Sequence, residues 1–210
     1  MNKHVDAALL ERLKLHQEWL ASFGQAGRQL WLEDADLTGL DLSDRDLSQA
    51  HLAGARLDSV CLCQANLYSA NLASASLCGV NLTRGDLTKA TLDYASLVNA
   101  LLRETKAFRA SFMHVDMRGA DLTGADLRYA HFEDANLEGA ILCSARLEGA
   151  YLKHVRLIGT VLCGATGLES VWAQGVDVDV EGKVVRLAGE ELRHWLLRAG
   201  GGGTAETARL

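Results

Sequence analysis

Three residues of types that ligate metals, His114, Asp134 and His154, follow one another at intervals of twenty residues. Imidazole nitrogens and carboxylate oxygens bind Zn²⁺ when they converge on one ion from several directions. These three could meet only if the chain returned to the same place every twenty residues. They would then form a row on a flat surface, which favours a polar ladder with an imidazole on each side of a carboxylate. We therefore expect neither a metal site nor a cofactor.

Cysteine, the second reactive residue type, occurs five times but never with the C-x-x-C spacing of a metal or redox motif. Cys143 and Cys163 would become neighbours under the same period of twenty. A disulfide between them is geometrically conceivable, but we expect two free thiols, as is usual in a cytoplasmic protein. The sequence also lacks a nucleophile elbow, a P-loop and a dinucleotide fingerprint, so we do not expect an enzyme.

The element that must position these residues is a repeat with a period of five. From Leu32 to Leu162 an apolar residue returns at every fifth position, and 26 of the 27 centres are Leu, Phe or Met; the exception is Ala107. A second series of mostly small residues lies two positions before the centres, with Ala at 17 of the 27 positions and Val at four more. A period of five fits neither a helix nor a plain strand, so it indicates a repeat architecture.

The segments Ala35–Gly39 and Ala120–Gly124 both read Ala-Asp-Leu-Thr-Gly and resemble the consensus of the pentapeptide-repeat family. The resemblance implies an all-β solenoid, a right-handed quadrilateral β-helix of about seven coils. Alternation along an extended segment supports this fold, because it directs the centre and the residue two before it inward and the residue between them outward. Four such segments form one coil of twenty residues.

Four regions follow from this fold. We expect an N-terminal helical cap in residues 1–29, the β-helix in 30–169, a C-terminal cap with a dimerisation helix in 170–199 and a disordered tail in 200–210. A solenoid must hide its terminal core and its unpaired edge, which gives a role to the amphipathic helix expected from about His4 to Phe23. The alternative is that this helix binds a partner.

The C-terminal region alternates Val with polar residues and then regains a helical pattern. We expect a β-hairpin between Val176 and Leu187, with its turn at Glu181-Gly182, followed by a helix from Gly189 to about Arg198. This helix would place Leu192, Trp195 and Leu196 on one face. A Trp on a short exposed helix would lie in solvent, so we expect these three residues to join two copies of the chain as a homodimer.

The five-residue repeat has one irregular position in its first coil. Arg45 falls where a small side chain should enter the core, and an unpaired Arg buried there would be costly. We therefore expect a widened first coil in which Arg45 pairs with Asp44, Asp46 or the helical cap.

A second irregularity spans residues 105–109, where Ala107 replaces a large centre. We expect a local bulge that swings Phe108 inward to fill the space. The alternative is an exposed Phe108 flanked by Lys106 and Arg109, which would form a contact patch.

The charge of the chain argues against direct binding to nucleic acid. The formal net charge is −6, and residues 30–169 alone hold 18 acidic and 12 basic residues. Five acids would gather on one side of the rod and form a partner-binding surface: Glu33, Asp34, Asp93, Glu133 and Asp134. No apolar run is long enough to span a membrane, and the charged N-terminus is unlike a secretory signal, so we expect a cytoplasmic protein.

The family resemblance extends to its quinolone-resistance members, which imitate DNA and protect DNA gyrase from inhibitors. It implies that this protein binds a type II topoisomerase, as a DNA mimic that confers antibiotic resistance or self-immunity. The alternative is a structural or scaffolding module whose flat faces bind another protein.

Overall fold

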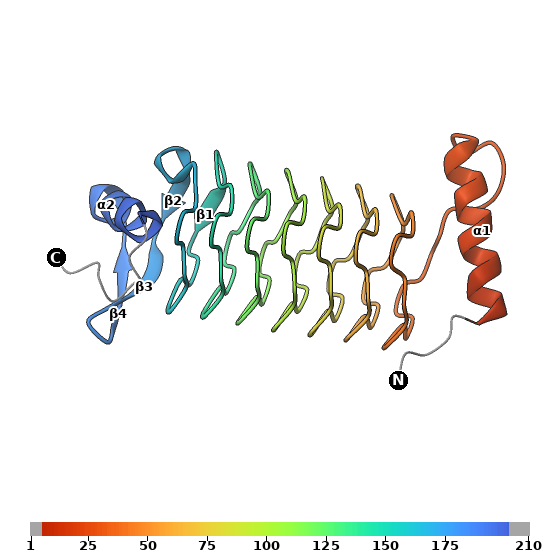
Figure 1. The fold of residues 1–210 in the computed structure, drawn as a ribbon, viewed down its shortest axis with the longest axis horizontal. Helices are drawn as coiled ribbons and strands as arrows, with labels where there is room; N and C mark the ends of the chain where they lie inside the picture. Colours follow the sequence, from red (N-terminus) through yellow and green to blue (C-terminus); the bar gives the residue numbers. More distant parts are fainter. Residues whose placement is uncertain (1–5, 202–210) are drawn as a thin grey trace.

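The computed structural model describes residues 6–201, which form an elongated rod of stacked coils with a helix at each end (Figure 1). Helix α1 spans Ala7–Ala21, and helix α2 spans Gly189–Gly200. The other regular elements lie towards the C-terminal end: β1 (Tyr151–Lys153), the 3-10 helix η1 (Leu168–Ser170), β2 (Trp172–Gln174), β3 (Val176–Val180) and β4 (Lys183–Leu187). Neither α-helix within this range is long and apolar enough to cross a lipid bilayer.

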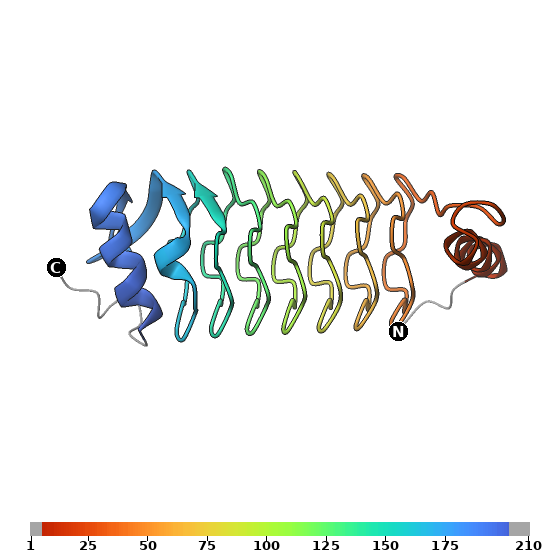
Figure 2. The ribbon, with the colours of Figure 1, turned by 90° about the horizontal axis from the view of Figure 1, so that it is seen from above.

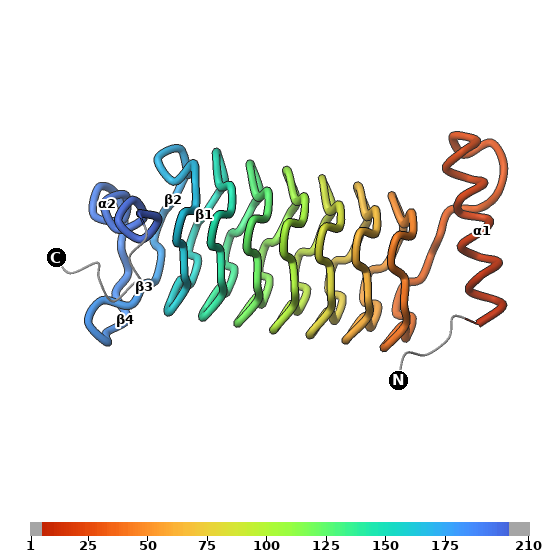
Figure 3. Tube along the Cα trace, in the orientation of Figure 1, coloured from red at the N-terminus to blue at the C-terminus, as the bar shows by residue number. Residues whose placement is uncertain are grey.

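Successive coils pair through parallel bridges between residues twenty apart, and the outline of each coil repeats along the rod (Figure 2). Four bridges recur in each coil, beginning with Trp31↔His51, Asp36↔Arg56, Asp41↔Cys61 and Asp46↔Asn66. These bridges run along the rod as four columns of stacked segments (Figure 3). Each column is named here after its first inward residue: the Leu32, Leu37, Leu42 and Leu47 columns.

The interior of the rod is the five-residue lattice. All 27 centres from Leu32 to Leu162 are buried, which confirms the predicted core. Phe112 and Phe132 stack on each other with ring centroids 5.0 Å apart. The small positions are also filled, and Thr105, the polar residue in one of them, donates its hydroxyl proton to the Leu82 carbonyl at 2.8 Å. This bond offsets the cost of burying a hydroxyl group.

The residues that flank each centre point outward and contact each other. Asp36 Oδ1 accepts the amide of Thr38 at 3.0 Å, and Asp121 Oδ1 accepts both the amide of Thr123 at 3.0 Å and its hydroxyl at 2.6 Å. The next residue turns the corner in the left-handed region, for example Asn99 with φ 56°. Short polar residues and Gly suit these two tasks, which explains their recurrence outside the core.

Helix α1 covers the N-terminal end of the rod. Asp6 caps the start of this helix, since its carboxylate accepts the amide of Leu9 at 2.7 Å, and the helix buries Leu9 and Leu13. His16 is also buried, and its Nδ1 accepts the amide of Leu30 at 3.1 Å. The first residues of the predicted helix, before residue 6, lie outside the described range.

The C-terminal end is closed by a hairpin and by α2. Strands β3 and β4 pair antiparallel with Val176 opposite Leu187, as the alternating valines predicted. Helix α2 packs against η1 and β2, and its last residue accepts the amide of Gly164 at 2.9 Å. Gly200 therefore belongs to the helix and not to the predicted tail, and residues 202–210 of that tail lie outside the described range.

The prediction that the apolar face of α2 joins two copies is wrong in its residues. Leu192, Trp195 and Leu196 are only 1–2% exposed within a single chain. The helix folds back over the last coil, so these side chains cover the end of the core. The exposed apolar residue of α2 is Leu197, at 43%.

The predicted pairing of Arg45 with Asp44 or Asp46 is also wrong. The backbone ladder continues through this position, since Asn66 donates its amide to the Arg45 carbonyl at 2.9 Å. The side chain is half-buried, and no ion pair links it to Asp44 or Asp46 within the described residues. The charge of Arg45 instead favours the ionised form of Asp41. The pKa of Asp41 lies below its usual value mainly because of the hydrogen bond from Ser43 and to a smaller extent because of Arg45.

No bulge forms at Ala107, which corrects the third expectation. The backbone of Lys106 forms parallel β-bridges with Asp86 in the preceding coil and with Asp126 in the next. Ala107 donates its amide to the backbone carbonyl of Asp126 at 2.8 Å. Ala107 is fully buried, while Phe108 stays on the outer surface, half-buried. A bulge would have broken ladder bonds to both neighbouring coils, so the regular backbone persists around the smaller side chain.

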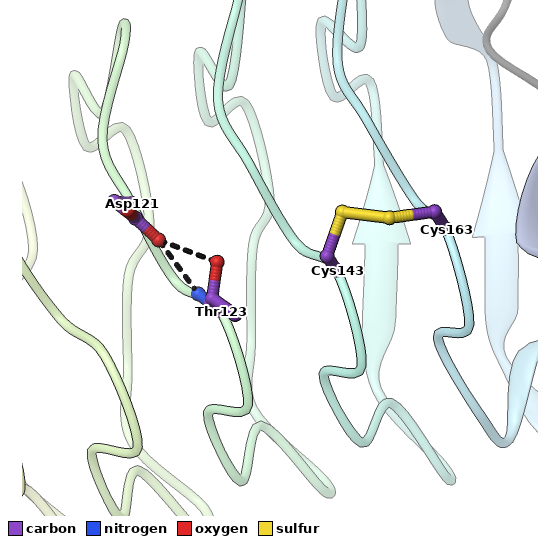
Figure 4. Close-up of a disulfide and its surroundings, with 4 residues drawn as sticks. All are labelled: Asp121, Thr123, Cys143 and Cys163. Atoms are coloured by element: carbon purple, nitrogen blue, oxygen red, sulfur yellow. Dashed lines mark hydrogen bonds between the residues drawn. A yellow bond between two sulfur atoms is a disulfide. The ribbon is translucent and has the colours of Figure 1, made fainter.

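Cys143 and Cys163 form a disulfide, so the expectation of free thiols is wrong (Figure 4). Both occupy the outer position after the centre in successive coils of the Leu42 column. The coil stacking holds their Cα atoms 4.6 Å apart. This separation lies within the range of about 4.4–6.8 Å that a disulfide spans without backbone movement.

Candidate functional site

Only the outer positions of the rod and its two ends are available to other molecules, because packing fills every inward position. The same stacking decides which outer side chains meet. Each outer residue lies beside the residues twenty positions before and after it. Within residues 6–201, no group of three or more His, Cys, Asp or Glu side chains is arranged to hold a metal ion.

The five predicted acids all lie on the Leu32 column but in three separate places. Glu33 and Asp34 belong to the first coil, Asp93 lies in the middle, and Glu133 and Asp134 lie towards the C-terminal end. The first and last groups are five coils apart, which is about 24 Å at a strand spacing near 4.8 Å. The structure therefore does not bring these acids together as one continuous surface.

Three of these five carboxylates, those of Asp93, Glu133 and Asp134, contact residues of neighbouring coils. Asp93 accepts hydrogen bonds from the hydroxyl of Ser111 and from the amide of Met113. Glu133 pairs with Lys153, and this hydrogen bond holds the pKa of Lys153 above its usual value. Glu33 and Asp34 are exposed, so the N-terminal end of the column presents its negative charge most directly.

The row of His114, Asp134 and His154 forms a ladder. The two imidazole Nδ1 atoms lie 3.8 Å and 3.4 Å from the oxygens of the central carboxylate. Tyr94 continues the row by stacking on His114, with ring centroids 4.6 Å apart. These side chains therefore lie in contact along one row of the Leu32 column.

The Leu47 column carries a mixed aromatic and cationic cluster around Phe108. The ring of Phe108 meets Tyr129 edge to face at 5.6 Å, and the guanidinium carbons of Arg109 and Arg128 lie 5.1 Å and 5.5 Å from its centroid. With Lys106 in the same coil, these residues are named the Phe108 patch. The sequence indicated Lys106, Phe108 and Arg109 but missed Arg128 and Tyr129, which the spacing of twenty would have found.

Part of the positive charge of the Phe108 patch is neutralised. Asp126 pairs with Arg128 at 2.6 Å and lies 3.7 Å from Arg146. The hydrogen bond from Arg128 is the main reason that the pKa of Asp126 lies below its usual value, since burial acts in the opposite direction. Lys106 and Arg109 are exposed and make no ion pair within the described residues. These two cations beside an aromatic pair are available to a partner.

The stacked coils, filled interior and outward charges define a repeat protein of the β-helix class. The profile of the family described as pentapeptide repeats matches residues 32–67, 70–106, 108–142 and 130–166, in eight copies. The chain therefore belongs to the pentapeptide repeat family, and its coils form a right-handed β-helix.

Several solved structures are similar to the chain. A pentapeptide repeat protein from the thylakoid lumen of Arabidopsis thaliana is 28% identical with a TM-score of 0.49, over 65% of this chain and 84% of its own. HetL from Nostoc sp. strain PCC 7120, which is involved in heterocyst differentiation regulation, is 24% identical with a TM-score of 0.33, over 87% and 100%. Trypsin-treated QnrB1, a plasmid-mediated fluoroquinolone resistance protein, is 19% identical with a TM-score of 0.40, over 71% and 82%. No match was found among the curated proteins.

Proposed function

We propose that the protein is a non-catalytic binding protein that imitates a DNA duplex and binds a type II topoisomerase such as DNA gyrase. Binding would protect the topoisomerase from inhibitors and so confer antibiotic resistance or self-immunity. The observation that carries the proposal is the distribution of acids around the rod. The Leu32 column holds five acidic residues and each of the other columns holds four, with Glu169 beyond them. Acidic side chains therefore face outward on every column, and their excess over Lys and Arg is largest on the Leu32 column, which holds five acids against Lys153.

The dimensions of the rod support this proposal. About seven four-sided coils at about 4.8 Å each give a length near 34 Å. That is about the length of ten base pairs, and two copies joined end to end would reach about twenty. We further propose that the homodimer uses the C-terminal end, where Leu197 of α2 and Val184 of β4 are 43% and 59% exposed.

The size of the charge determines how such a mimic would act. A duplex of about 34 Å carries about 20 phosphate charges, whereas the whole protein has a formal net charge of −6. Shape and specific contacts must therefore contribute more to the binding than long-range attraction. Since the proposed partner acts on chromosomal DNA, the proposal also places the protein in the cytoplasm.

Supercoiling assays with purified gyrase, with and without a fluoroquinolone, test the proposal. We expect the protein to inhibit supercoiling at high concentration or to restore it in the presence of the drug. The double variant Glu33→Gln, Asp134→Asn should weaken the effect, whereas the control Glu190→Gln, Glu191→Gln removes two charges from α2 and should not. The absence of inhibition, protection and binding at micromolar protein would rule the proposal out.

A second candidate is a scaffolding module that binds another protein through the Phe108 patch. The specific observation in its favour is that aromatic and Arg side chains, which dominate the energetics of many interfaces, are clustered on that surface. If gyrase shows no response, a partner captured by the parent protein but not by a Phe108→Ala, Arg109→Ala variant would support this candidate. Leu101→Ala, at an exposed outer position on the Leu42 column, is the control.

A further inference from the structure

Two thiols meet on the outer surface of the Leu42 column. Cys61 and Cys63 flank the buried Leu62, and alternation along the extended segment directs both of them outward on the same face. Their Sγ atoms are 3.1 Å apart, and both residues are half-buried. This separation is only about 1 Å longer than a disulfide bond.

The geometry of the repeat imposes this approach. The same two positions carry Asp41 and Ser43 one coil earlier, and their side-chain oxygens lie 2.6 Å apart. Asp121 and Thr123 repeat the contact at 2.6 Å further along the column (Figure 4). The backbone therefore brings together whatever occupies these positions, and Cys61 and Cys63 place two sulfur atoms there.

The surroundings of the two thiols make them chemically unequal. The hydroxyl of Ser43 lies 3.0 Å from Cys61 Sγ, and its single proton serves either Cys61 or Asp41. Burial raises the pKa of the Cys61 thiol, but hydrogen bonds from Ser43 and Cys63 outweigh burial and hold this pKa below its usual value. Burial and the adjacent Cys61 sulfur raise the pKa of Cys63 to about 11. The first thiolate therefore forms on Cys61, with the remaining proton on Cys63.

We propose that Cys61 and Cys63 form a dithiol site that reacts with small disulfides, with Cys61 as the attacking thiol and Cys63 as the resolving thiol. The Cys61 thiolate attacks one sulfur of the small disulfide, forms a mixed disulfide and releases one small thiolate. Cys63 then loses its proton to solvent and attacks Cys61 Sγ, which forms the Cys61–Cys63 disulfide and releases the second small thiolate. The protein dithiol is oxidised by two electrons, and the small disulfide is reduced to two thiols.

The mixed disulfide prepares the second step. Once Cys61 is bonded to sulfur it carries no negative charge, so it no longer opposes ionisation of Cys63. The pKa of Cys63 then loses the contributions of Cys61, keeps those of burial and of Asp41, and falls from its initial value. The resolving thiolate thus becomes accessible only after the first step.

The third free cysteine, Cys78, provides a matched control within the same chain. It is also half-buried and contacts a hydroxyl, that of Ser96 at 3.2 Å. Among the described residues no second thiol lies in hydrogen-bond contact with it. Cys78 should therefore lack the resolving partner.

The experiment treats the full-length protein with oxidised β-mercaptoethanol and follows the products by mass spectrometry. All three free cysteines fall in one tryptic peptide, residues 57–84, so fragmentation assigns each product within one spectrum. We expect an internal Cys61–Cys63 disulfide in the parent and in Cys78→Ser, and a trapped mixed disulfide on Cys61 in Cys63→Ser. In Cys61→Ser the reaction of Cys63 should be about tenfold slower than that of Cys61 in the parent.

Two results would overturn the proposal. One is reaction of Cys78 at the same rate as Cys61. The other is a parent protein that keeps a stable mixed disulfide on Cys61 as Cys63→Ser does. The equivalent positions one coil earlier hold Asp41 for Cys61, Ser43 for Cys63 and Asp58 for Cys78. Small polar residues are therefore accommodated there, so these variants should fold, and circular dichroism checks this. The site does not depend on the proposed topoisomerase partner.

Discussion

Truncation of Leu97 tests the assignment of inward and outward positions most directly. Leu97 is completely buried near the middle of the rod, whereas Leu101, four residues later, occupies an outer position and is 39% exposed. Leu97→Ala removes the same atoms as Leu101→Ala but leaves a cavity in a packed core. The two substitutions therefore differ in environment and not in chemistry.

The expected costs follow from these environments. Leu97→Ala should lower the free energy of unfolding by about 3 kcal/mol, because buried Leu→Ala changes cost about 2–5 kcal/mol. Leu101→Ala should cost about 1 kcal/mol, since the side chain is only partly removed from water and no cavity forms. In a chain of this size each kcal/mol lowers Tm by about 2–4 °C, which gives about 6–12 °C for Leu97→Ala and about 2–4 °C for Leu101→Ala.

Thermal unfolding followed by circular dichroism measures both variants under identical conditions. Equal losses of Tm would contradict the register of the repeat. Leu97→Asp extends the test, because an ionised carboxylate without a partner in the core should prevent folding altogether.

Three further predictions concern the two ends of the rod. Burial holds the pKa of His16 below its usual 6.5. The contribution of the neutral imidazole to stability is therefore complete above pH 6.5 and is lost as the pH falls below that value. Tm measured as a function of pH should show this loss in the parent but not in His16→Gln. Trp195→Glu should open the C-terminal cap, seen as faster amide exchange in α2, whereas Leu197→Glu should leave Tm unchanged and abolish the dimer in light scattering. The hydrogen bond from Arg186 is the main reason that the pKa of Asp177 is below its usual 3.8. The stabilisation from this pair is therefore present above pH 3.8 and is lost as acid protonates Asp177. Arg186→Ala should expose the β3–β4 hairpin to proteolysis at neutral pH, whereas the control Lys183→Ala should not.

The interior of this protein could be predicted from sequence because one requirement repeats at every fifth residue. Each centre must be buried away from water. A residue of the wrong size or polarity at a centre would disturb the packing of both neighbouring coils. Thr105 shows how far this requirement extends, since it enters the core only with its hydroxyl bonded to the Leu82 carbonyl. Ala107 shows that the ladder, and not the size of one side chain, fixes the backbone.

The errors occurred where the outcome depends on a contact that the period does not encode. The apolar face of α2 was recognised, but the sequence alone does not state whether Trp195 meets a second copy or the last coil of its own chain. The end of the rod offers an uncovered core directly beside the helix, and burial within one chain avoids the loss of translational freedom that association requires. The proximity of Cys143 and Cys163 followed from the period of twenty residues. Whether the two thiols are oxidised to a disulfide does not follow from that period.

The outer surface is readable once neighbours are taken at intervals of two and of twenty residues. The interval of twenty joins Phe108 to Arg128 and Arg109 to Tyr129, which makes a patch from residues that are distant in sequence. The interval of two joins Cys61 to Cys63 across Leu62. Neither group is needed to pack the core, and each could be replaced by the small polar residues found elsewhere in the same columns. An outer position that departs from those residues is therefore where a function of this rod should be sought, and the Phe108 patch and the dithiol are two such departures.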